Sequence, residues 1–169
     1  MYVERDIHGA GRCSPAVLRA AIVDRGKRLA ATYAPGGVYR EPPAGIEDII
    51  IAECRRFPGY EVDPDGAVAQ INEETAGLQS AFWVERNNPG GIGAIDSDPG
   101  QAIRFATPAD GIRAHVAKLR NYRFGEGPWS VEDPRATAIR LRGWMGTCRT
   151  WADLQGKWAT SDTYTQSLE

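Results

Sequence analysis

Apolar residues recur every three or four positions along several stretches of this sequence, the spacing that places them on one face of an α-helix. Cap residues followed by proline precede three of these stretches, at Ser14-Pro15, Asp63-Pro64 and Thr107-Pro108, and such pairs mark helix starts. The pattern therefore predicts helices over residues 15–31, 46–57, 65–80 and 108–122, with a short one after Pro134.

The middle of the chain has a different pattern. A glycine-rich segment at residues 87–93, NNPGGIG, leads into two short apolar pieces at residues 92–95 and 102–105. The turn-like sequence DSDPGQ separates these pieces, which predicts a small β-hairpin. The expected fold class is thus mainly α (α+β): a helical bundle with one short β-hairpin.

Length and composition are those of one ordinary domain. The chain has 169 residues, of which 42% are hydrophobic and 25% charged, enough to bury a core. Neither a repeat nor a linker divides it. We therefore expect a single domain over residues 1–169, with a helical amino-terminal part (1–60) and a part that carries the functional motifs (61–169).

Several function classes are disfavoured by charge and residue usage. Twenty Lys and Arg against 22 Asp and Glu leave no basic excess, so nucleic-acid binding is not expected. No stretch reaches the ~20 apolar residues of a membrane span, and the first residues lack the apolar run of a signal peptide. Three scattered cysteines and two histidines predict no metal site and no cofactor.

One carboxylate stands among apolar residues on the third predicted helix. Ala67, Ile71, Glu74 and Leu78 share one face, whereas Glu73 points ~100° away. A carboxylate in an apolar stripe must be paired, desolvated or at the edge of a cleft. The helix alone leaves two interpretations open for Glu74, a structural ion pair and a general acid.

Three segments in the second half of the chain resemble one enzyme family. Residues 69–80, AQINEETAGLQS, resemble the segment around the catalytic glutamate of glucosaminidase-type peptidoglycan hydrolases, glycoside hydrolase family 73. That family has Ala-Gln-x-x-x-Glu-Thr-Gly-x-x-x-Ser, and here Ala76 replaces the glycine. Residues 87–92, NNPGGI, resemble its Asn-Asn-x-x-Gly-Ile segment, and residues 158–164, WATSDTY, resemble its carboxyl-terminal segment. The three occur in family order.

The resemblance implies a lysozyme-like fold in which a central helix carries the catalytic glutamate. It makes Glu74 the general acid that protonates the leaving glycosidic oxygen. It also makes Tyr164 a residue beside that acid, where its hydroxyl could bond the substrate acetamido group or position a water. A buried core tyrosine is the competing interpretation.

The resemblance and the aromatic content also point to substrate-binding residues. Asn87 and Asn88 correspond to the pair that closes a turn below the cleft, with a structural role and a substrate contact both open. Gly91 permits close backbone approach to sugar hydroxyls. Trp83 and Trp158 lie next to the motifs and are the best-placed flat apolar faces for a sugar ring.

The position of a second carboxylate is the feature in which this sequence departs from the family pattern. Many relatives carry an acidic residue on a longer hairpin beyond the Asn-Asn segment. Asp96 and Asp98 lie in the shorter segment here and are candidates for the base that activates water, of which we favour Asp96. Ordinary turn chemistry explains the same residues, and assistance by the N-acetyl group of the substrate would need neither.

The function implied is that of a peptidoglycan hydrolase cleaving β-1,4 glycosidic bonds, with endo-β-N-acetylglucosaminidase specificity. Its partner would be the glycan strand at the bacterial cell wall, and the protein is expected to act as a monomer. It would be a phage lysin, a virion component or an excised domain of a secreted protein. A lytic transglycosylase or muramidase is one alternative, although the Glu-Ser and Gly-Leu-Met-Gln segments typical of transglycosylases are missing. A non-catalytic wall-binding or phage structural module is the other.

Overall fold

The structure, a computed structural model, describes residues 4–94 and 99–159 and is mainly helical within them. This confirms the mainly helical class predicted from the sequence. The α-helices are α1 (Pro15–Tyr33), α2 (Ile46–Arg55), α3 (Pro64–Thr75), α4 (Ala81–Arg86), α5 (Pro108–Phe124) and α6 (Ala136–Leu141). Short 3-10 turns lie at Pro35–Gly37, Pro99–Gln101, Pro128–Glu132 and Trp151–Leu154.

The cap residues begin the helices where the sequence places them. The side chain of Ser14 accepts a hydrogen bond from the Val17 N–H at the start of α1. At the start of α5, Thr107 and Asp110 form a reciprocal capping box. Such bonds satisfy amide donors that have no partner inside the helix, and they use only residues adjacent in sequence.

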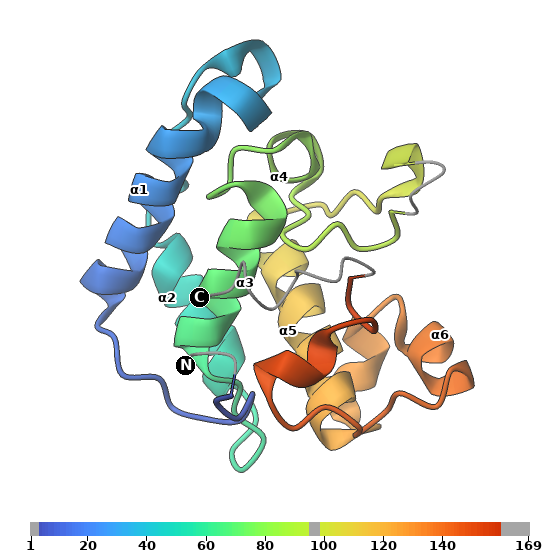
Figure 1. The fold of residues 1–169 in the computed structure, drawn as a ribbon. Helices are drawn as coiled ribbons and strands as arrows, with labels where there is room; N and C mark the ends of the chain where they lie inside the picture. The colour runs from blue at the N-terminus through green and yellow to red at the C-terminus, as the bar shows by residue number, and fades with distance from the viewer. Residues whose placement is uncertain (1–3, 95–98, 160–169) are drawn as a thin grey trace.

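The helices pack around α2 and α3, with α5 beside them (Figure 1). Helix α2 contacts α1, α3 and α5, and α1 also contacts α3. Their apolar faces meet in one core cluster whose largest fully buried side chain is Trp151, from the carboxyl-terminal segment. Burial extends over almost the whole circumference of α5, so polar residues on this helix are buried as well.

Helix α3 ends five residues earlier than the predicted boundary at Ser80. Ala76, Gly77 and Leu78 all have positive φ, which turns the chain out of the helix directly after Thr75. A Cβ on Gly77 would lie 2.3 Å from the backbone nitrogen of Gly26 on α1, so only glycine allows this approach. The early end leaves Glu74 in the last turn of α3, where its side chain is half-buried.

The predicted hairpin is only partly formed in the described residues. Its two arms lie side by side, since the Ile103 N–H donates to the Ile92 carbonyl at 2.8 Å, but neither arm forms a strand there. Side chains supply other bonds to this segment: Asn88 donates to the carbonyls of Ile92 and Ile103, and Arg86 donates to those of Gly100 and Ala102. The Ile92 carbonyl therefore accepts from both the Ile103 amide and Asn88, and side-chain donors hold the two arms where a β-ladder was expected.

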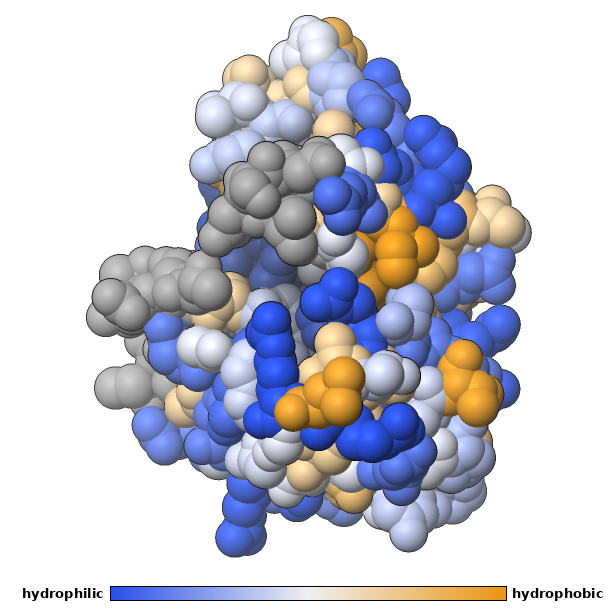
Figure 2. Space-filling model, turned by 90° about the vertical axis from the view of Figure 1, so that its right-hand side faces the viewer, coloured by the Kyte–Doolittle hydropathy of each residue, from blue (hydrophilic) through white to orange (hydrophobic). Residues whose placement is uncertain are grey.

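The face shown in Figure 2 is largely hydrophilic, with apolar residues in separate patches. Among the described residues of the whole surface, Val131 and Leu141 are the most exposed large apolar side chains. The described helices include none with the length and apolar character needed to cross a membrane.

Candidate active site

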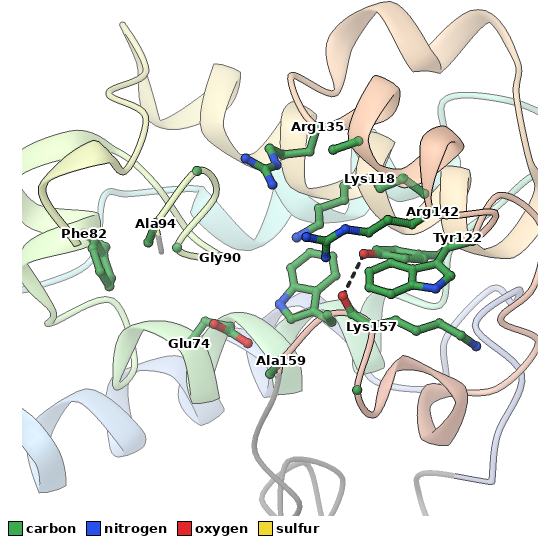
Figure 3. A pocket seen from close by; sticks show the side chains of 17 residues that line it. Glu74, Phe82, Gly90, Ala94, Lys118, Tyr122, Arg135, Arg142, Lys157 and Ala159 are labelled. Atoms are coloured by element: carbon green, nitrogen blue, oxygen red, sulfur yellow. Dashed lines mark hydrogen bonds between the residues drawn. The ribbon is translucent and has the colours of Figure 1, made fainter. Parts of the chain in front are cut away.

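A cleft of about 510 Å³ separates the end of α3 and the 90–94 loop from α5, α6 and the carboxyl-terminal segment. Figure 3 shows Glu74, Phe82 and Gly90 on one side and Lys118, Tyr122 and Arg142 on the other. The lining residues are Glu74, Phe82, Gly90, Gly91, Gly93, Ala94, Lys118, Tyr122, Arg135, Ala138, Ile139, Arg142, Trp144, Gly156, Lys157, Trp158 and Ala159.

Glu74 is the one carboxylate among the described residues that line this cleft. The next residue back, Glu73, instead forms an ion pair with Arg25 of α1 at 2.6 Å on another side of the helix. A Cβ on Gly91 would lie 4.0 Å from Glu74 Oε2, so the loop backbone closely approaches the carboxylate without covering it. Because consecutive residues on a helix point in different directions, one of these two carboxylates lies in the cleft and the other in an ion pair outside it.

The loop beside Glu74 is held by the side chain of Asn88. This residue is fully buried; its amide donates to the carbonyls of Ile92 and Ile103, and its oxygen accepts from the amides of Gly90 and Ile92. Four backbone groups are thus satisfied by one side chain, which fixes the glycine-rich wall of the cleft.

Aromatic rings form the opposite wall. Trp158 packs edge-on against His115, with ring centroids 4.9 Å apart, and lies 6.0 Å from the Tyr122 ring. The loop packs against the same pair, because a Cβ on Gly90 would lie 2.5 Å from His115 Nδ1. Burial lowers the pKa of His115 to about 3, so its imidazole is neutral at physiological pH. Burial also raises the pKa of Tyr122, whose hydroxyl donates to the Lys157 carbonyl at 3.0 Å.

A lysine lies at the base of this wall. Lys118 on α5 is 9% exposed, and its ammonium is 3.6 Å from the centroid of the Trp158 ring. Burial is the main cause that lowers its pKa, to about 8, against the opposing attraction of Asp133 and Glu74. Burial also raises the pKa of Asp133, a carboxyl that accepts bonds from the Asn121 side chain and the Arg135 amide.

The structure brings together three of the residues expected from the sequence. Glu74, Gly91 and Trp158 all line the cleft, although they belong to α3, the glycine-rich loop and the carboxyl-terminal segment. Asp96 and Tyr164 lie outside the described residues, so their predicted roles stay predictions.

Trp83 departs from its expected place. Its side chain is 5% exposed and packs in the core, whereas the neighbouring Phe82 lines the cleft. The two residues are consecutive on α4, and one helical step rotates a side chain by ~100°. Phe82 is therefore the aromatic residue that α4 presents to this site.

The asparagine pair also has a different placement from the one expected of substrate-binding residues. Neither Asn87 nor Asn88 lines the cleft. Asn87 ends α4 in the left-handed conformation, with φ of 52°, and its side chain donates to the Phe105 carbonyl at 3.1 Å. The side chain of Asn88 bonds to the backbone of the turn, so in the described residues both asparagines hold the loop and do not face the cleft.

The far wall also holds basic residues that were not among the site residues predicted from the sequence. Lys118, Arg135 and Arg142 all line the cleft. A signal for Lys118 was present: it lies three residues after His115 and four before Tyr122 on the same predicted helix. That spacing places all three on one face.

Chemically, the cleft combines one carboxylate, flat aromatic surfaces and cationic groups. Among the described residues there is no group of three His, Cys, Asp or Glu side chains that could hold a metal ion. A half-buried carboxylic acid beside apolar faces is suited to donate a proton to a bound sugar oxygen.

A comparison with protein-family models gives no match to this chain, and neither does a comparison with curated proteins. Among solved structures, the chain is similar to the catalytic domain of the autolysin Auto from Listeria monocytogenes. The identity is 18%, the match covers 79% of this chain and 85% of that chain, and the TM-score is 0.43. At this level the similarity says nothing about the chemistry of the cleft, which follows from its own residues.

Proposed function

We propose that this protein is a peptidoglycan hydrolase that cleaves β-1,4 glycosidic bonds of the wall glycan as an endo-β-N-acetylglucosaminidase. One observation carries the proposal: the glutamate in register with the family motif, Glu74, is also the one carboxylate among the described lining residues of the 510 Å³ cleft. The motif comes from sequence and the cleft from packing, so the two supports are independent. The protein would act at the cell wall as a monomer.

In this proposal Glu74 acts as the general acid. Its carboxylic acid protonates the oxygen of the leaving sugar as the glycosidic bond breaks. Phe82 and Trp158, on opposite walls, offer apolar faces to the sugar rings, and the backbone of Gly91 offers a close approach to sugar hydroxyls. Asp96 is proposed as the base that activates water, and Tyr164 as the residue that orients the acetamido group or that water.

The test uses insoluble peptidoglycan and mass spectrometry of the released fragments. The unmodified protein is expected to release fragments with reducing N-acetylglucosamine ends. Glu74→Gln should lower the rate at least ~100-fold, because general acid catalysis is typically worth two to four orders of magnitude. Glu73→Gln is the matched control, since that carboxylate pairs with Arg25 away from the cleft, and it should retain activity within about threefold.

The same fragments identify the competing activities. Anhydro-muramic ends would assign a lytic transglycosylase, and reducing N-acetylmuramic ends a muramidase. Absence of cleavage by the unmodified protein would contradict any hydrolase assignment and leave a wall-binding module. Asp96→Asn and Asp98→Asn in the same assay decide which of these carboxylates, if either, is the base.

A further inference from the structure

Positive charge collects on the wall of the cleft that faces Glu74. Lys118, Arg135, Arg142 and Lys157 all line the cleft, and Glu74 is their one acidic counterpart among its described lining residues. They come from α5, the start of α6, the end of α6 and the carboxyl-terminal segment, so tertiary packing brings them together. The chain as a whole carries a net charge of −2, which makes this wall a local exception.

Three of these cations form no salt bridge with any carboxylate of the described residues. Lys157 is bonded to the Asp153 carbonyl, and Figure 3 shows its ammonium directed away from the others. Lys118, Arg135 and Arg142, by contrast, have no carboxylate within 4 Å in the part of the chain that the structure describes. Some arginines elsewhere in the described residues do pair with a carboxylate, as Arg25 does with Glu73.

The ammonium of Lys118 is the most informative of the three. It is nine-tenths buried, is directed into the cleft in Figure 3, and lies over the ring of Trp158 at 3.6 Å and that of Tyr122 at 5.9 Å from the centroids. A buried cation without a hydrogen-bonded anion costs folding free energy, and Arg135 adds like-charge repulsion. An anion that enters the cleft would relieve both.

We infer that Lys118, Arg135 and Arg142 form a subsite for a carboxylate carried by the glycan substrate, which selects substituted peptidoglycan over neutral β-1,4 glycans. This inference rests on the proposed function. In peptidoglycan, alternate sugars carry a lactyl group that ends in a carboxylate or in a peptide with carboxylates of its own. A strand lying between Glu74 and the aromatic wall would bring such a substituent against α6.

The guanidinium groups suit this ligand because they can form charge-assisted bonds to carboxylate oxygens. Arg142 is already positioned by the ring of Trp144, whose centroid lies 4.9 Å from its Cζ. Arg135 is held at the start of α6 by its amide, which donates to Asp133. A side chain held against a ring, as that of Arg142 is, loses less conformational freedom on binding than a free one does.

The experiment measures co-sedimentation with insoluble peptidoglycan, using Glu74→Gln so that the polymer stays intact. In that background Arg135→Gln and Arg142→Gln should each raise the Kd about fivefold to tenfold, as expected for one charge-assisted contact. Arg140→Gln is the matched control, because Arg140 lies on the same helix but pairs with Glu126. It should change the Kd by less than twofold.

Two further polymers identify the ligand. On peptidoglycan stripped of phosphate-containing polymers, the effect of the two variants should persist. On chitin, a neutral β-1,4 glycan of N-acetylglucosamine, both should have a much smaller effect. With Glu74 intact, the ratio of kcat/KM on peptidoglycan to kcat/KM on soluble chitin oligomers should fall at least fivefold in Arg135→Gln/Arg142→Gln.

The outcomes separate the two proposals. If the unmodified protein cuts the wall but both variants bind as their parent does, the carboxylate subsite is wrong while the proposed function stands. An effect that disappears with the phosphate polymers, or that Arg140→Gln reproduces, also overturns the subsite. Failure of the unmodified protein to cut any wall contradicts the proposed function, whereas the binding measurement still reports on the basic wall.

Discussion

Replacing Lys118 by methionine should make the protein more stable and its binding to peptidoglycan weaker. Methionine has a similar length and retains favourable contact with the Trp158 ring, so the main change is the loss of a buried charge. A residue that lowers stability and lines a cleft is expected to persist in a sequence when it contributes to ligand binding.

The size of the gain follows from the titration of the lysine. Burial lowers the pKa of Lys118 from 10.5 to about 8. At about 1.4 kcal/mol per pH unit, this difference sets a ceiling of about 3.5 kcal/mol on the net cost of burying the charged form, in which the attraction of Asp133 and Glu74 is already included. Lys118→Met recovers at most this cost, so we expect it to gain about 1 to 3 kcal/mol at pH 7.

The sign of the pH dependence provides a second check. Because the folded pKa is the lower one, the cost is fully present below pH 8, where both states hold the proton. Between pH 8 and about 10.5 the unfolded state binds more protons, so the stability of the parent rises with pH. The advantage of Lys118→Met should therefore be greatest at pH 7 and should close as the pH approaches 10.5.

Urea unfolding of both proteins at pH 7, 9 and 10.5 measures this difference, and titrations common to both cancel. Peptidoglycan binding in the Glu74→Gln background should fall at least fivefold at pH 7. A variant that loses more than 1 kcal/mol at pH 7, or whose difference from the parent does not change with pH, would refute the reasoning. In either case the ammonium would be a structural partner and not an unpaired charge.

Three further changes test how the site is held. Gly77→Ala should lower the free energy of unfolding by about 3 kcal/mol, because residue 77 has a φ of 68° and its new Cβ would overlap the backbone of Gly26. Gly36 is the control: its φ is 76° but no atom lies near its Cβ position, so Gly36→Ala should lower the free energy by only about 1 kcal/mol, as measured by thermal unfolding. Asn88→Ala removes four hydrogen bonds to the loop backbone and leaves the amides of Gly90 and Ile92 and the Ile103 carbonyl without this partner, so the variant should be about 3 kcal/mol less stable and should no longer cleave the wall. A loss of stability under 1 kcal/mol in urea unfolding would contradict the structural role of Asn88. Folding lowers the pKa of His115 from 6.5 to about 3, so the unfolded state binds more protons below pH 6.5 and the parent loses stability as the pH falls. Between pH 7 and 4.5, His115→Phe should therefore lose about 2 kcal/mol less stability than the parent.

Local interactions explain which parts of the fold were predictable. The starts of α1 and α5 follow from Ser14 and Thr107, whose side chains bond to amides only three residues away. The end of α3 was not predictable, because it depends on the approach of Gly77 to Gly26, which is remote in sequence. The hairpin was only partly predicted, since side-chain donors such as Asn88 hold its two arms where a β-ladder was expected.

For the site, the sequence by itself determined that Glu74 and Glu73 face different ways, because helical phase depends on position alone. Tertiary structure decided the rest. It placed Trp83 in the core and Phe82 in the cleft, and it placed the buried ammonium of Lys118 on the wall opposite the acid. The physical reason is that the direction of a side chain follows from its own helix, whereas its burial and its charge partners depend on which distant segments pack around it.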